Sequence, residues 1–127
     1  MNRFIAYTGK YFTIEWYFDA NGNSKALEYY KALSLEEKNK LMYLFQAMGD
    51  FGKIRNQHKF NYEGNQIYAF KPMPHRFLSF FFTGSKIIVT NAFEKKQQKL
   101  PQIEKDKALR YRQDYEIRVK KGLYYEK

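Results

Sequence analysis

Apolar and aromatic residues gather in three short runs between residues 66 and 98, and turn-forming residues separate the runs. Runs rich in β-branched and aromatic residues with turns between them are typical of an antiparallel meander. Its strands are predicted over residues 67–71, 77–83 and 86–93. Pro72 and Pro74 end the first strand, since proline cannot donate a ladder hydrogen bond. Gly84 and Ser85 are expected to form a two-residue hairpin loop, in which glycine supplies a positive φ.

Residues 11–18 alternate between apolar and polar side chains, which is the pattern of a strand with one face on a core. One side carries Phe12, Ile14, Trp16 and Phe18, and the other carries Thr13 and Glu15. Residues 19–23, with the sequence Asp-Ala-Asn-Gly-Asn, form a turn that ends this strand. Residues 1–10 show no clear period, so we expect an irregular lead-in there.

Two helices are predicted next, over residues 24–32 and from residue 34 to Gly49 or Gly52. Ser24 can cap the first helix. Ser34 opens the second, and Glu37 three residues later completes a capping box. Apolar residues follow a helical spacing in the second helix, at Leu41, Leu44, Phe45, Met48 and Phe51. Such a helical hairpin must cover one face of a sheet.

The rest of the chain is predicted to be a polar connector and a last helix. The connector covers residues 52–64, with a turn at residues 61–65. Pro101 suits the first turn of the last helix, and Gly122 ends it. An apolar stripe of this helix comprises Ile103, Ala108, Tyr111, Tyr115 and Val119. The predicted fold is therefore α+β: an N-terminal strand, a helical hairpin, a three-stranded antiparallel meander and a C-terminal helix, in a single domain of residues 1–127.

Charge and composition limit the kinds of partner and site that this protein is expected to have. The net charge is +10, and residues 94–127 hold half of it in about a quarter of the chain. A basic C-terminal third indicates a polyanionic partner, either nucleic acid or an acidic protein segment. Cysteine is absent and there are only two histidines, so disulfides and thiolate or histidine-rich metal sites are not expected. We see no signal peptide and no membrane span, and we expect a cytoplasmic protein without a cofactor.

Basic residues lie at the ends of the predicted meander strands, at Lys71, Arg76, Lys95 and Lys96. Together they form a candidate phosphate-binding site. Each also has a plainer interpretation. Arg76 could pair with a carboxylate of the last helix, and the adjacent lysines could be solvated charges in a turn.

Several stretches resemble the RelE/HigB-type toxins of bacterial toxin–antitoxin pairs, in particular a phage-derived HigB-like branch of the RelE/ParE superfamily. They are Lys59-Phe60, residues 67–71, residues 76–82, residues 87–93 and the Phe-x-Lys-Lys-x-x-x-x-Pro segment from Phe93 to Pro101. The resemblance covers roughly residues 11–116, and the segment before Pro101 is its most specific part.

The resemblance implies a small endoribonuclease that cuts mRNA, usually on the ribosome, and that a cognate antitoxin neutralises. The antitoxin of such a pair often carries a helix-turn-helix DNA-binding domain. In these enzymes the ribose 2′-hydroxyl attacks the adjacent phosphate without a metal, which requires cations and proton-transfer groups. By position, the catalytic candidates are Lys71, Arg76, Lys95, Lys96 and, as a proton carrier, His75. The RNA-binding candidates are Lys59, Tyr68, Phe93 and Lys99.

The chain departs from the family pattern at two places. Many relatives have an acidic residue where Ala69 stands, and often a His-Gly pair where this chain has Asn91-Ala92. These departures keep a second hypothesis open, namely a non-catalytic binding module or a gyrase inhibitor of the ParE type on the same fold.

Overall fold

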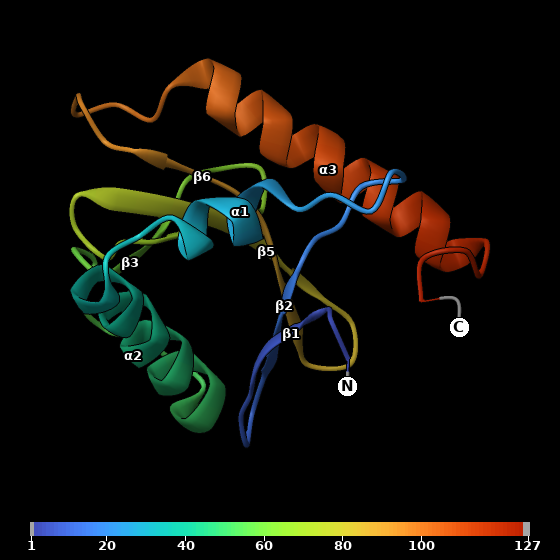
Figure 1. Ribbon diagram of the computed structural model, residues 1–127, viewed down its shortest axis with the longest axis horizontal. Coiled ribbons are helices and arrows are strands. Elements are labelled where there is room, and N and C mark those ends of the chain that lie inside the picture. Colours follow the sequence, from blue (N-terminus) through green and yellow to red (C-terminus); the bar gives the residue numbers. More distant parts are fainter. Residues whose placement is uncertain (1, 126–127) are drawn as a thin grey trace.

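A six-stranded sheet forms the framework of the computed structural model, which describes residues 2–125 (Figure 1). The strand order is β1-β2-β6-β5-β4-β3. The strands are β1 (Ile5–Thr8), β2 (Thr13–Trp16), β3 (Phe60–Tyr62), β4 (Tyr68–Phe70), β5 (His75–Phe82) and β6 (Lys86–Glu94). β2 runs parallel to β6, and the other neighbouring strands are antiparallel. The long central pair β5–β6 is therefore protected by a neighbour on each side.

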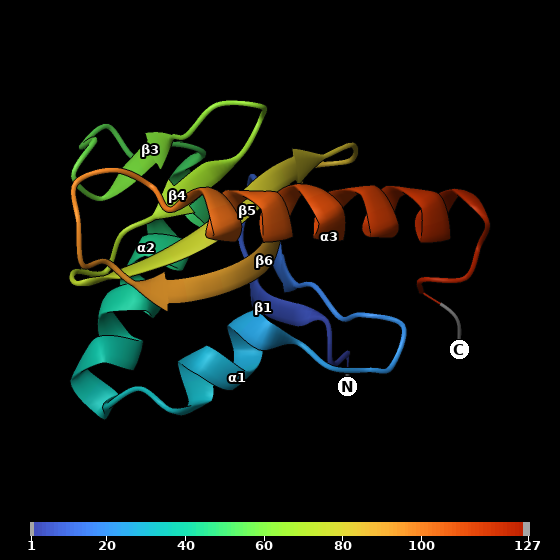
Figure 2. The same ribbon diagram turned by 90° about the horizontal axis from the view of Figure 1, so that it is seen from above.

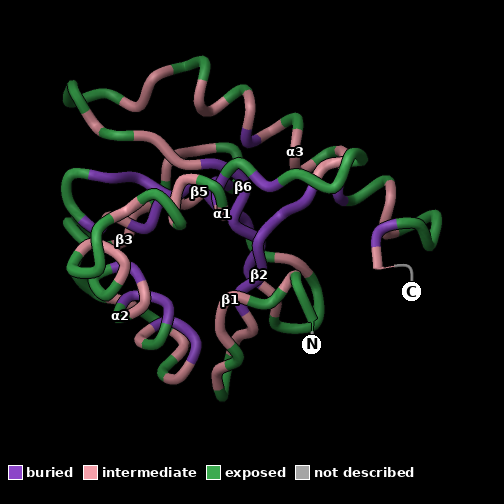
Figure 3. Tube along the Cα trace, viewed as in Figure 1, coloured by how far each residue is buried: buried purple, intermediate pink, exposed green. Residues whose placement is uncertain are grey.

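Helices cover both faces of this sheet. Helices α1 (Lys25–Lys31) and α2 (Leu35–Phe51) lie on one side, and α3 (Gln102–Lys120) crosses the other (Figures 1 and 2). A buried cluster fills each gap: Phe45 and Phe77 belong to the one under α1 and α2, and Phe80 and Tyr115 to the one under α3. All four rings are fully buried, and many of the buried residues lie on the inner strands (Figure 3).

The α+β fold class is confirmed, and so are the predicted helix starts. Ser24 accepts a hydrogen bond from the backbone N–H of Leu27 at 3.2 Å. Ser34 and Glu37 form the expected capping box, which satisfies backbone N–H groups that the first turn leaves free. The meander is also confirmed, with β4, β5 and β6 consecutive and antiparallel.

Two strands were missed in regions expected to be irregular. Residues 5–8 are not a loose lead-in but form β1, which pairs with β2. Residues 60–62 form β3 on the edge of β4, so the turn expected at residues 61–65 begins only after Tyr62. Both are short edge strands, and backbone pairing with a neighbour stabilises them without a long hydrophobic pattern.

Some predicted orientations are wrong. Glu15 was expected on a polar face but is buried, because α3 and the C-terminal residues cover that face, and its carboxylate accepts a hydrogen bond from the Tyr125 hydroxyl at 2.6 Å. Phe51 and Ile103 were placed in apolar stripes but are 72% and 66% exposed; Phe51 is the last residue of α2, and Ile103 is the second residue of α3. The β5–β6 loop has three residues rather than two, because Phe82 pairs with Lys86.

Within the described chain, no helix has the length and apolar composition needed to cross a membrane.

Candidate functional site

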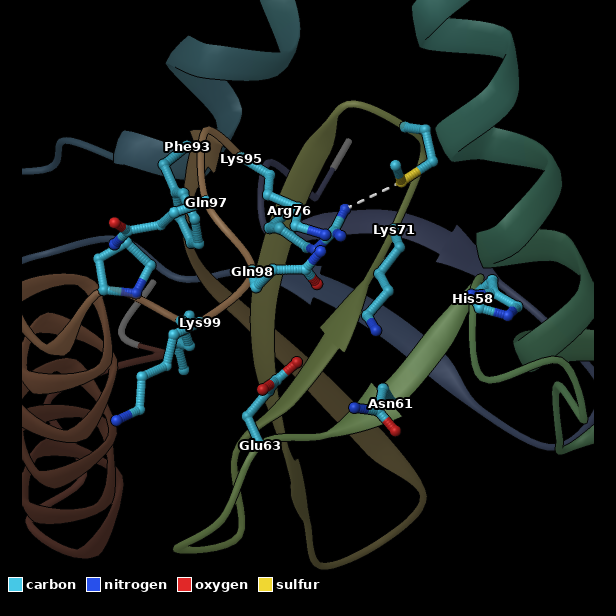
Figure 4. A pocket seen from close by; sticks show the side chains of 13 residues that line it. His58, Asn61, Glu63, Lys71, Arg76, Phe93, Lys95, Gln97, Gln98 and Lys99 are labelled. Atoms are coloured by element: carbon cyan, nitrogen blue, oxygen red, sulfur yellow. Dashed lines mark hydrogen bonds between the residues drawn. The ribbon is translucent and has the colours of Figure 1, made fainter.

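A cavity of about 320 Å³ opens on the α3 side of the sheet, where β4 and β6 end and β5 begins (Figure 4). The loop between β6 and α3 forms its outer wall. The residues that line it are His58, Asn61, Glu63, Lys71, Met73, Arg76, Phe93, Lys95, Gln97, Gln98, Lys99, Leu100 and Pro101. In Figure 4, Arg76 occupies the middle of this group, with Lys71 to its right and Glu63 below.

The alternation of side chains along the strands directs the cations into this cavity. Phe70 and Phe77 point into the core under α1 and α2. Their neighbours Lys71 and Arg76 therefore point to the opposite face. Lys95 directly follows β6, and its backbone N–H donates to the carbonyl of Pro74 at 2.8 Å. Three cations from three chain segments are thus brought to one place, as the sequence predicted for Lys71, Arg76 and Lys95.

Arg76 is only 7% exposed and is held by uncharged groups. Its Nη1 donates to the carbonyl of His75 at 3.1 Å and to the sulfur of Met73 at 3.2 Å. No carboxylate of residues 2–125 lies within ion-pair distance of it, which rules out the pairing with the last helix. Burial lowers the pKa of Arg76, and the negative charge of Glu63 opposes that effect. A guanidinium has five N–H donors, so Arg76 retains donors for an anion.

Lys71 lies in the field of the other cations. Its ammonium donates to the carbonyl of Gln57 at 3.1 Å. Burial is the main cause that lowers the pKa of Lys71, and the charges of Arg76 and Lys95 lower it further while Glu63 raises it. The cavity is therefore a concentrated positive site with a single opposing carboxylate, and an anionic group would relieve the repulsion between its cations.

Glu63 supplies that carboxylate, and the sequence reasoning missed it. It is the only acidic side chain that lines the cavity among the described residues. A signal was available, because Glu63 is the only Asp or Glu between Asp50 and Glu94. His58, an exposed residue of the connector between α2 and β3, also lines the cavity.

Four other predicted residues do not line the cavity. His75 lies within β5 rather than in a loop, and its ring bonds to Tyr29 and Glu37 on the opposite face of the sheet. Tyr68 stacks on Phe60, with ring centroids 5.6 Å apart. Lys96 is exposed beside the cavity, and Lys59 lines a different groove along α2. Phe93 and Lys99, by contrast, line the cavity.

The two positions that depart from the family pattern have structural roles here. Ala69 is fully buried in the core under α3. Asn91 is 2% exposed, and its amide donates to the backbone carbonyl and to the carboxylate of Glu104. These bonds tie β6 to the first turns of α3 and so fix the ends of the loop that walls the cavity.

A comparison with protein families identifies one family that matches this chain. The family model of phage-derived Gp49-like proteins (DUF891) matches residues 28–113, about two thirds of the chain. The chain belongs to this family. The Gp49-like proteins are a toxin-like family related to RelE and HigB, and the matched region contains every residue that lines the cavity. No curated protein matches the chain.

No group of three or more His, Asp or Glu residues is placed to hold a metal ion in the described part of this Gp49-like chain. What the cavity can do follows from the groups present. Its cations can bind a phosphodiester and stabilise negative charge that develops on it, and Glu63 can accept a proton.

Proposed function

We propose that this Gp49-like protein is the toxin of a toxin–antitoxin pair of the HigB type and that it cleaves mRNA in the cavity around Arg76. The observation that carries this proposal is the convergence of Lys71, Arg76 and Lys95 on one cavity that also contains Glu63. Three cations that line one cavity suit the binding of a phosphodiester group. Membership in a toxin-like family supports the biological role.

Arg76 is the proposed phosphate ligand. Its guanidinium can bind two phosphate oxygens at once, which fixes the phosphorus relative to the attacking hydroxyl. Because Arg76 is almost fully buried, its charge acts in a medium of lower polarity than water. Lys95 adds a second positive charge that stabilises the phosphorane-like transition state.

Two further residues move protons in the proposed reaction. The carboxylate of Glu63 takes the proton of the 2′-hydroxyl as the 2′-oxygen attacks phosphorus. The bond from phosphorus to the 5′-oxygen breaks, and Lys71 gives a proton to that oxygen. Its lowered pKa makes its ammonium a better acid than an ordinary lysine. The products are a 2′,3′-cyclic phosphate and a 5′-hydroxyl, and no metal enters any step.

The outer wall of the cavity offers contacts to the rest of the RNA. The ring of Phe93, opposite Arg76 in the β5–β6 register, can stack on a base next to the bound phosphate. Lys99 can bind a neighbouring phosphate. These contacts would position an unpaired strand, such as mRNA in the ribosomal decoding site.

A cleavage assay tests this proposal. Purified protein is added to ribosomes programmed with a defined mRNA, and primer extension locates the new 5′-ends. We expect cuts by the wild-type protein and none above background by Arg76→Ala. Lys31→Ala, which removes an exposed lysine at the end of α1, should cut like the wild type. Intact mRNA with the wild-type protein, both on and off the ribosome, would contradict the proposal.

A second candidate is a non-catalytic binding module or a gyrase inhibitor of the ParE type. The observation in its favour is that Ala69 and Asn91, where relatives often have an acid and a histidine, serve the core and the β6–α3 connection here. This candidate predicts growth inhibition with DNA damage signalling and with intact mRNA, which the same assay would detect.

A further inference from the structure

A second and larger cavity, of about 830 Å³, extends along α2. One wall is the side of α2 that does not pack on the sheet, and the other is the connector of residues 53–59. We call this cavity the α2 groove. Its apolar lining residues are Leu35, Tyr43, Leu44, Ala47, Ile54 and Pro72.

The α2 groove exposes large apolar side chains that nothing in the described chain covers. Leu35 is 74% exposed and Tyr43 is 70% exposed. Leu35, Tyr43 and Ala47 are separated by eight and four residues in α2, so they lie on one face of the helix. A contiguous apolar strip in a concave surface is the mark of an interaction site.

The rim of the α2 groove is basic. Its cations are Lys40, Lys53, Arg55 and Lys59, and Glu36 is the only acidic residue among the described residues that line it. None of these cations forms an ion pair with a described residue. An apolar floor between unneutralised positive charges is complementary to an apolar stripe flanked by carboxylates.

We propose that the α2 groove binds an acidic amphipathic helix of a partner protein. The apolar strip from Leu35 to Ala47 is about 18 Å long at 1.5 Å per residue, which matches a helix of about twelve residues. Such a helix would insert apolar residues spaced i, i+3, i+4 and i+7 and would direct Asp or Glu toward the rim. Single-stranded RNA fits less well, because the strip offers only one aromatic ring for base stacking.

The connector of residues 53–59 links the α2 groove to the cavity around Arg76. The carbonyl of Gln57 accepts from the ammonium of Lys71 at 3.1 Å, and the carbonyl of Lys59 accepts from the Lys71 backbone N–H at 2.8 Å. A helix in the groove would therefore contact the segment that holds Lys71 without entering the cavity. Under the proposed function the partner would be the antitoxin, but binding to the groove does not depend on nuclease activity.

The binding test uses a labelled synthetic peptide and the whole chain. The peptide has about fourteen residues, with leucines spaced i, i+3, i+4 and i+7 and glutamates on the other positions. One control peptide has the same composition in scrambled order, and a second has lysine in place of glutamate. By fluorescence anisotropy, we expect the acidic amphipathic peptide to bind at least tenfold more tightly than both controls, and more weakly as salt increases.

Matched variants locate the binding site. Tyr43→Glu should lower the affinity for the peptide at least tenfold. Ile103→Glu makes the same kind of change at an exposed apolar residue of α3 and should leave the affinity unchanged. Arg76→Ala should bind the peptide like the wild type. Thermal unfolding of each variant confirms that it is folded.

Three results would overturn the proposal. They are equal affinity for the scrambled peptide, unchanged affinity in Tyr43→Glu, and an RNA oligonucleotide whose affinity falls in Tyr43→Glu but not in Arg76→Ala. The last would assign the α2 groove to nucleic acid. All three measurements are independent of mRNA cleavage, so failure here leaves the proposed function to its own test.

Discussion

His75 Nε2 lies 2.7 Å from a carboxylate oxygen of Glu37, which joins the first residue of β5 to the first turn of α2. The other ring nitrogen of His75, Nδ1, lies 2.7 Å from the hydroxyl of Tyr29 in α1. One buried imidazole therefore connects both helices of the hairpin to the strand that carries Arg76. The connection fixes β5 from the face opposite the cavity.

The contact predicts a pH dependence of stability. The hydrogen bond with His75, followed by those with Ser34, lowers the pKa of Glu37 to about 2. A carboxyl with a lowered pKa stabilises the folded state fully above its unfolded pKa, about 4.3, and that contribution is lost as the pH falls toward 2. Glu37→Gln keeps a side chain that suits a capping box but removes the charge. In urea unfolding, the wild type should exceed the variant in stability at pH 6, and the difference should shrink toward pH 3. A difference that stays constant with pH would contradict this.

A second prediction distinguishes the role of His75 in stability from the proposed role of Arg76 in cleavage. His75→Ala leaves Glu37 and Tyr29 without their partner, so we expect it to lower the free energy of unfolding by about 1–3 kcal/mol. At a temperature where it is folded, it should still cleave mRNA within a few-fold of the wild type, since its side chain faces away from the cavity. Arg76→Ala should lose cleavage, and its free energy of unfolding should change little. Loss of cleavage in folded His75→Ala would place the imidazole in the reaction.

A third prediction concerns Glu63 as the base. Glu63→Gln should slow cleavage by about 10²-fold or more, as expected when a general base is removed. RNA binding should be unchanged or tighter, because the one carboxylate among the described lining residues of the cavity becomes neutral. Binding is measured with an oligonucleotide that has a 2′-deoxy group at the cleavage position and so cannot react. Weaker binding together with unchanged cleavage would exclude the assigned role.

A fourth prediction tests how closely α2 packs on the β1–β2 hairpin. A Cβ at Gly9 would lie 2.2 Å from the carbonyl carbon of Gly49, and that carbonyl accepts the backbone N–H groups of Tyr11 and Phe12. Gly9→Ala must therefore displace backbone, and we expect a loss of about 3 kcal/mol, at the upper end for an overpacked site. Gly84→Ala is the control, because its Cβ meets no atom and only the positive φ of 79° is strained, which costs about 1–2 kcal/mol. Chemical denaturation should rank Gly9→Ala as the less stable variant.

Much of the local structure was predictable from the sequence, because it depends on neighbours in the chain. The Ser34–Glu37 capping box, the apolar spacing in α2 and the strands of the meander follow from residues only a few positions apart. Positive charges at the strand ends were also visible, and the structure brings Lys71, Arg76 and Lys95 into one cavity as expected.

The tertiary structure decided what those charges face. Alternation along a strand indicates that His75 and Arg76 point to opposite sides, but it does not say which side the helices fill and which remains open. Glu63 and His58 reach the cavity only because β3 pairs with β4, a pairing too short to leave a hydrophobic pattern. The sequence alone thus determined the helices and strands and the presence of basic residues at the strand ends, since both depend on local chemistry. The choice of partners for each charge depends on packing between residues far apart in the chain, and only the folded structure shows it.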